Sequence, residues 1–193
     1  MSLAGTAPEA TTWLLVEVPA PWGGKALAES DLPSDVKSHL LAWEAEAGDR
    51  RVQFIRRETN VFDASGRITV FVAHVSRHAP LLYALHLDDY SDLLNVDLGR
   101  YDGKQLPSED SNRRPPIFLT CTNGRRDACC AKWGRKLAGA VSEAAGNLAW
   151  QTTHLGGHRF APTLLVLPHG SQYGWLEPED AGPLVEAHRS GRL

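Results

Sequence analysis

The first half of the chain alternates short apolar runs with polar segments that contain glycine or proline. The run Trp-Leu-Leu-Val-Glu-Val at residues 13–18 is ended by Pro19 and predicts a buried strand. Two further strands are predicted over residues 52–57 and 68–75, and the Asp-Ala-Ser-Gly sequence at 63–66 predicts that they form a hairpin. The pattern then predicts a strand over residues 81–87 and a short helix over 88–94.

Three longer helices are predicted by apolar residues at spacings of three and four. The first covers residues 34–47, with Ser34 as its cap, Gly48 after its end and an apolar face formed by Val36, Leu40, Leu41 and Trp43. The second begins after Asp127, which can cap it, and ends near Gly146, with Trp133, Leu137 and Val141 pointing inward. The third closes the chain over residues 179–188, and Pro178 suits its first turn.

The second half of the chain repeats the order of elements found in the first. Residues 98–116 contain few apolar side chains and are interpreted as a connector. Strands are then predicted over residues 117–121, 148–153, 163–167 and 173–176. Short matches in the same order, such as Trp-Gly-Gly-Lys at 22–25 and Trp-Gly-Arg-Lys at 133–136, favour an internal duplication of one β-α-β-β-(α) unit. The alternative is that two α/β units share a common element order.

The predicted fold class is therefore α/β, with three segments along the chain. Residues 1–97 form a first unit without cysteines, residues 98–116 the connector, and residues 117–193 the unit that carries the chemistry. The length of 193 residues suits one large domain or two small, closely packed ones.

Composition excludes several classes of protein. The formal charge of −3 gives no reason to expect nucleic-acid binding, and no stretch approaches the roughly 18 apolar residues that would span a membrane. The first twelve residues lack a basic segment followed by an apolar one, so no signal peptide is expected. Three cysteines are too few for a disulfide framework, which favours a reducing, cytoplasmic location.

All three cysteines fall within ten residues of the second unit. Cys121 closes a predicted strand, and Cys129 and Cys130 lie in the first turn of a predicted helix. The unpaired N–H groups at a helix N-terminus favour thiolate over thiol, and thiolate is the form that binds metals. Arg125 and Arg126 act in the same direction.

A pair of histidines follows in the sequence His154-Leu155-Gly156-Gly157-His158. Two adjacent glycines disfavour a helix, so the segment is interpreted as a loop that can turn both imidazoles toward one point. Loops at the carboxyl ends of strands gather at one edge of an α/β sheet, so the loops after Cys121 and Thr153 are expected to meet there. Each of these residues alone is more often an ordinary core or surface residue, but their combination favours a metal site.

The residue types do not decide which metal would bind. Two sulfurs and two nitrogens suit tetrahedral zinc or an iron–sulfur centre. Eight residues separate Cys121 from Cys130, whereas zinc fingers have two to four between their cysteines, so a larger group is favoured.

At these residues the sequence resembles the sucrase/ferredoxin-like family, also called thioredoxin-like ferredoxins. The matching segments are residues 121–130, 153–161 and 163–174, and the resemblance is specific over about residues 115–190. It implies a thioredoxin-like fold and a [2Fe–2S] cluster held by Cys121, Cys130, His154 and His158. Cys129 is then an extra thiol, and Arg126, Asp127, Gly156 and Gly157 would surround the ligands. The chain departs from the family at Asn123, where members often have histidine that could relay protons.

The resemblance implies a small electron carrier or redox sensor, not a catalyst, with an unidentified redox protein as its partner. Two imidazole ligands favour reduction, so the potential is expected above the roughly −400 mV of plant-type ferredoxins and to fall as pH rises. The alternatives are a zinc-binding structural protein and a thiol-based redox protein, although no Cys-x-x-Cys motif is present. Sugar hydrolysis would need two placed carboxylates, and Glu177, Glu179 and Asp180 are explained by the start of a helix.

Overall fold

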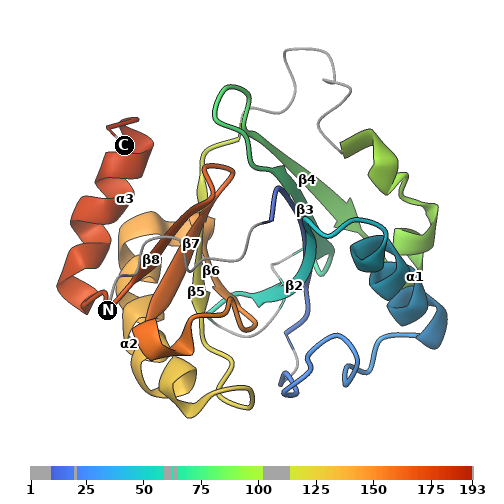
Figure 1. Cartoon of the computed structure of the whole chain (residues 1–193), viewed down its shortest axis with the longest axis horizontal. Coiled ribbons are helices and arrows are strands. Elements are labelled where there is room, and N and C mark those ends of the chain that lie inside the picture. Colours follow the sequence, from blue (N-terminus) through green and yellow to red (C-terminus); the bar gives the residue numbers. More distant parts are fainter. Residues whose placement is uncertain (1–9, 20, 59–61, 63–64, 102–113, 193) are drawn as a thin grey trace.

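The apolar runs of the sequence form one curled sheet of mixed strand direction. The computed structural model describes residues 10–19, 21–58, 62, 65–101 and 114–192 (Figure 1). The eight strands of the sheet lie in the order β4-β3-β1-β2-β6-β5-β7-β8. Their bounds are β1 Thr12–Glu17, β2 Arg50–Arg56, β3 Ile68–His74, β4 Leu81–Leu87, β5 Ile117–Cys121, β6 Ala149–Thr152, β7 Thr163–Leu167 and β8 Ser171–Gly174.

Helices cover the sheet at both ends. In Figure 1, α1 (Ser34–Ala45) lies on the right, and α2 (Ala128–Ala145) and α3 (Ala181–Arg189) lie on the left. Short 3₁₀ turns complete the described segments: η1 Tyr90–Asn95, η2 Leu98–Tyr101, η3 Gly146–Leu148, η4 His158–Phe160 and η5 Pro178–Asp180. None of the helices in these segments is long and apolar enough to cross a membrane.

The two halves of the sheet have the same pattern of strand pairing. In the first, β1 is parallel to β2 and antiparallel to β3, which pairs with β4. In the second, β5 is parallel to β6 and antiparallel to β7, which pairs with β8. An antiparallel contact between β2 and β6 joins the halves, with Ile55 opposite Thr152. The α/β class is confirmed, whereas the thioredoxin-like duplication and the domain bounds stay predictions, and most of the predicted connector lies outside the described residues.

The predicted hairpin between residues 52–57 and 68–75 is wrong. Strands β2 and β3 do not pair with each other, because β1 lies between them and pairs with both. Every residue of β1 is buried, so this strand occupies the centre of its half, where it uses both of its edges. Of the expected turn, Asp63 and Ala64 lie outside the described residues.

Several local predictions are also corrected. Ser34 is the first helical residue of α1 and does not cap it, because Pro33 stands at the cap position. Leu41 and Trp133 were expected to face inward, but their exposed fractions are 44% and 43%. The last strand ends at Gly174, since Trp175 has a φ of 57° that extended backbone does not adopt.

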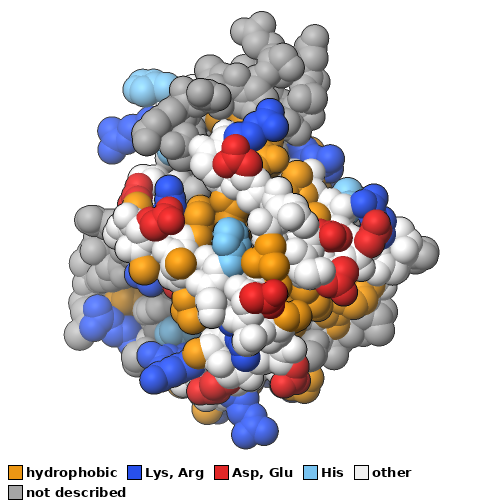
Figure 2. Space-filling view, turned by 90° about the vertical axis from the view of Figure 1, so that its right-hand side faces the viewer, with side chains coloured by type: hydrophobic (Ala, Val, Ile, Leu, Met, Phe, Trp, Pro, Cys, Tyr) orange, Lys and Arg blue, Asp and Glu red, His pale blue; other side chains and the backbone are white. Residues whose placement is uncertain are grey.

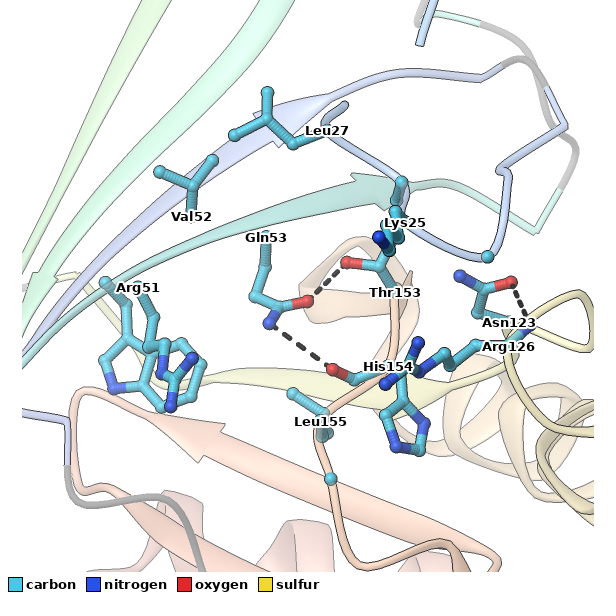
Figure 3. Close-up of a pocket in the computed structure, with 14 residues that line it drawn as sticks. Lys25, Leu27, Arg51, Val52, Gln53, Asn123, Arg126, Thr153, His154 and Leu155 are labelled. Carbon is cyan, nitrogen blue, oxygen red and sulfur yellow. Dashed lines mark hydrogen bonds between the residues drawn. The ribbon is translucent and has the colours of Figure 1, made fainter. Parts of the chain in front are cut away.

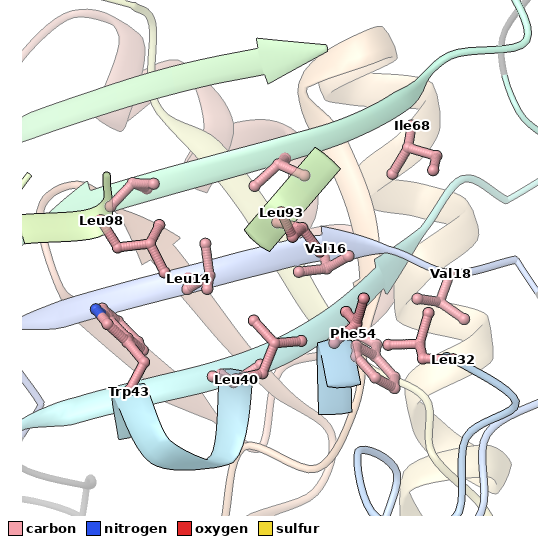
Figure 4. Close-up of a cluster of buried hydrophobic side chains, with 14 of the residues drawn as sticks. Leu14, Val16, Val18, Leu32, Leu40, Trp43, Phe54, Ile68, Leu93 and Leu98 are labelled. Carbon is pink, nitrogen blue, oxygen red and sulfur yellow. The ribbon is translucent and has the colours of Figure 1, made fainter. Parts of the chain in front are cut away.

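The core consists of three clusters of buried side chains. Two lie on the face of the sheet that the helices cover, and the third lies on the opposite face. Leu40 and Trp43 of α1 pack with Leu14 and Phe54 on one face (Figure 4), and α2 and α3 cover residues of β5 and β7. The opposite face carries a cluster drawn from both halves, which includes Cys121, Cys130 and the ring pair Phe71 and Trp150, 5.5 Å apart. The candidate cysteines therefore belong to the cluster that both halves share.

A buried histidine fastens α3 to the sheet. His188 is 2% exposed, and its Nδ1 lies 2.9 Å from Nδ1 of His169 while its Nε2 lies 3.0 Å from the Tyr173 hydroxyl. The His188 ring also makes an edge-to-face contact with the ring of Phe118 in β5. Burial, reinforced by His169, lowers the pKa of His188 to about 4. The folded protein therefore holds this imidazole neutral.

We predict that acid destabilises the fold through His188. In the unfolded chain His188 takes up a proton near pH 6.5, while in the folded protein it does so only near pH 4, so stability is complete above pH 6.5 and is lost between these values. The loss at pH 5 should be about 2 kcal/mol. Urea unfolding at pH 7.5 and pH 5 measures it. His188→Gln should remove most of this pH dependence and the exposed control His86→Gln should keep it; an unchanged slope in His188→Gln contradicts the assignment.

Candidate metal centre

The parallel pairing of β5 with β6 brings two chemically important loops to one edge of the sheet. Cys121 is the last residue of β5 and lies opposite Thr152, the last residue of β6. The next residues continue side by side, since the Thr122 amide donates to the Thr152 carbonyl at 3.1 Å. His154 follows two residues after the end of β6, so the predicted meeting of the two loops is confirmed.

The second sulfur comes from the first turn of α2. Asp127 caps this helix by accepting a hydrogen bond from the Cys129 amide at 2.9 Å, as predicted. The turn points Cys130 inward, where it is 1% exposed, and leaves Cys129 exposed at the surface. None of the three cysteines is in a disulfide bond.

Cys121, Cys130 and His154 converge on one point. Nδ1 of His154 lies 3.6 Å from Sγ of Cys130 and 4.0 Å from Sγ of Cys121, and the three atoms lie within 4.8 Å of one another. Two soft sulfurs and an imidazole nitrogen at these distances form a group that could hold a metal ion.

A hydrogen bond links the two buried cysteines and shifts their pKa values in opposite directions. The Cys130 thiol donates a hydrogen bond to the Cys121 sulfur, which holds the pKa of Cys121 well below its usual value, and His154 contributes in the same direction. The same bond, together with burial, raises the pKa of Cys130. This hydrogen bond favours the thiolate form at Cys121 and the thiol form at Cys130, so metal binding must release a proton from Cys130.

The glycines of the histidine segment allow a loop, as predicted. Gly156 and Gly157 have φ values of 86° and 63°, in the region where residues with side chains are strained. Leu155 stands between His154 and these glycines in the sequence. Its side chain is buried, which fixes the loop against the core. His158 begins η4, but its side chain lies outside the described part of the structure, so its approach to the sulfurs stays a prediction.

The first half of the chain holds the centre in place through contacts that the sequence alone did not predict. Gln53 of β2 donates to the His154 carbonyl at 3.5 Å and accepts a hydrogen bond from the Thr153 hydroxyl. Asn123, which is 3% exposed, donates to the Gly23 carbonyl at 3.0 Å and accepts from the Arg126 amide. Gln53 and Asn123 each bond to a residue about a hundred positions away along the chain, so no local signal in the sequence reveals these contacts.

Comparison with protein families identifies a family for the chain. A family model described as Sucrase/ferredoxin-like matches residues 3–192, nearly the whole chain. The chain belongs to the sucrase/ferredoxin-like family. The match includes the first half, where the sequence resemblance was loose. No curated protein and no solved structure matches the chain.

The close packing of α2 on β5 is the most restrictive contact in this sucrase/ferredoxin-like centre. A Cβ added to Gly134 would lie 2.0 Å from the Cys121 carbonyl oxygen. No side chain fits there, so only glycine lets α2 approach the end of β5 closely enough to bring the two sulfurs together.

Gly134→Ala should therefore destabilise the fold by about 1–3 kcal/mol, because α2 must move away from Cys121. Urea unfolding measures the loss, and the metal content of the purified variant should fall with it. Gly182→Ala is the matched control, since a Cβ there meets nothing within 4 Å in a helix, and it should be neutral or stabilising. Equal stability of Gly134→Ala and wild type would show that the contact is not restrictive.

Proposed function

We propose that this protein binds a [2Fe–2S] cluster through Cys121, Cys130, His154 and His158 and acts as a small electron carrier or redox sensor. The observation that carries the proposal is the convergence of two cysteine sulfurs and one imidazole nitrogen in a member of the sucrase/ferredoxin-like family. The three donors come from three separate segments, which suits a bound group larger than one ion.

Both the types of the ligand residues and their surroundings suit a [2Fe–2S] cluster. Thiolates bind iron in [2Fe–2S] proteins, and in some centres two imidazoles replace two of them. Cys121 and Cys130 are buried, with a thiolate already favoured at Cys121, and the loop of His154 carries the second histidine four residues later. Bound here, the cluster would accept and release a single electron.

The surrounding residues have roles that do not depend on which metal binds. Asp127 holds the first turn of α2 and thereby the position of Cys130. Gln53 and Thr153 fix the backbone that carries His154. Arg126 is exposed beside the site and offsets the negative charge of the thiolates.

The repeated strand pairing supports a further part of the proposal, that the chain contains two tandem thioredoxin-like units. The second unit carries all of the donors, and the first supplies the wall formed by β2. The redox partner is expected to be another protein that exchanges electrons at the edge of the sheet near His154.

Zinc is the second candidate, because three donors within 4.8 Å of one another also suit a single tetrahedral ion. Zinc has no redox chemistry, so its role here would be structural. A thiol-based redox function is less favoured, since Cys121 and Cys130 are both buried and the exposed Cys129 forms no disulfide with another described cysteine.

Single substitutions test which residues hold the metal. After anaerobic reconstitution with iron and sulfide, Cys121→Ser, Cys130→Ser, His154→Ala and His158→Ala should each lose most of the bound iron, because each removes one ligand. Iron, sulfide and zinc are measured on the same samples. Circular dichroism shows that each variant is folded.

Cys129→Ser is the matched control, since it changes a neighbouring but exposed thiol. It should keep iron and sulfide at the wild-type level. Full iron in Cys121→Ser or Cys130→Ser, or loss of iron in Cys129→Ser alone, contradicts the proposed ligand set.

A further inference from the structure

A polar pocket lies beside His154, outside the sulfur site. Its volume is about 420 Å³, and it is an open pocket bordered by β2 and by the loops that follow β1, β5 and β6 (Figure 3). His154 and Gly156 line it, whereas Cys121 and Cys130 do not. The pocket and the sulfurs therefore meet at the imidazole of His154 without sharing the cysteines.

The charged residues that line this pocket all have the same sign. Lys25, Arg51 and Arg126 contribute to its wall, and no acidic residue of the described chain does. None of the three cations forms an ion pair with another described residue. The whole chain has a net charge of −3, and Figure 2 shows acidic and basic side chains interspersed on the face that carries α1. The cationic pocket is therefore a local feature.

The cations stand at two ends of the pocket. In Figure 3, Arg51 lies at one end, while Lys25 and Arg126 gather with His154 at the other. The wall between them is neutral: Val52 and Leu155 are apolar, and both ends of the Gln53 amide are used by His154 and Thr153. A ligand complementary to this pocket has an anionic group at each end and a short neutral segment between them.

We propose that this pocket binds a small organic anion with two separated anionic groups, such as a dicarboxylate or a phosphorylated carboxylate, which we call a dianion for its two groups. One anionic group pairs with Arg51 and the other with Lys25 and Arg126, since guanidinium groups form paired hydrogen bonds with carboxylate and phosphate. The volume lies in the range of small-molecule sites. The shared chemistry of both ligand types is the separation of two negative groups by a few neutral atoms.

Occupancy would be sensed at the metal centre, a consequence that rests on the proposed function. Negative charge beside His154 disfavours the addition of an electron, so the dianion binds more tightly to the oxidised than to the reduced protein. By linkage, the bound dianion makes reduction correspondingly harder. The pocket thus couples a metabolite-sized anion to the redox state of the centre.

Calorimetric titration of the purified chain at low ionic strength tests the binding, whatever metal the chain holds. The probes are malonate, succinate, glutarate and 3-phosphoglycerate, with butyrate as a monoanion and dimethyl succinate as a neutral analogue. At least one dianion should bind with a dissociation constant below about 1 mM, and the monoanion and diester should bind at least tenfold more weakly. Binding should weaken as salt is added.

Charge-removing variants locate the site. Arg126→Gln and Arg51→Gln should each weaken dianion binding about tenfold. Arg125→Gln removes the same charge from the adjacent residue, which does not line the pocket, and should leave the affinity unchanged. No binding of any dianion at 10 mM, or equal weakening by Arg125→Gln and Arg126→Gln, overturns the proposal.

These outcomes are independent of the proposed cluster. A chain that binds dianions but holds no iron keeps the pocket and loses the [2Fe–2S] assignment. A chain that holds the cluster but ignores every dianion keeps the proposed function and loses this inference. Preference for 3-phosphoglycerate over all dicarboxylates identifies phosphate as one of the two anionic groups, and the reverse preference identifies two carboxylates.

Discussion

The parallel register of β5 and β6 is the constraint on which the rest of the candidate centre depends. Because Cys121 lies opposite Thr152, the chain leaves both strands at the same level and His154 reaches the sulfur of Cys121. A slip of one residue would turn Cys121 to the other face of the sheet. The close approach of α2 at Gly134 then adds Cys130 to the same point. Two backbone contacts thus set the position of three donors.

The cysteine-free half is part of this arrangement. It contributes β2, whose Gln53 holds the backbone of His154, and the turn at Gly23, which anchors Asn123. The shared apolar cluster places Phe71 of the first half against Trp150 of the second. The family match extends over nearly the whole chain and therefore includes this half.

Local signals in the sequence predicted the elements well. Buried strands such as β1 and β5 are continuous apolar runs, and Asp127 is recognisable as a helix cap from its own chemistry. Pairing order was not predictable, because the placement of β1 between β2 and β3 depends on long-range contacts. The inward face of α2 was misjudged at Trp133, since the buried position is Gly134, which has no side chain to reveal it.

For the candidate site, too, the sequence predicted what depends on local spacing and missed what depends on distant contacts. Cysteine and histidine types, and the two glycines between the histidines, indicated a metal site from local spacing alone. The supports Gln53 and Asn123 could not be found in this way, because each acts through a partner about a hundred residues away. Asn123 in particular has a structural role, since its buried amide ties two loops together.

The most direct test of the account is the composition and colour of the protein purified without oxygen. The visible absorption spectrum is recorded, and iron and acid-labile sulfide are assayed on the same sample. If the proposed cluster is present, we expect a red-brown protein with about two irons and two sulfides per chain. A colourless protein that contains zinc, or that takes up neither iron nor sulfide on reconstitution, would contradict it.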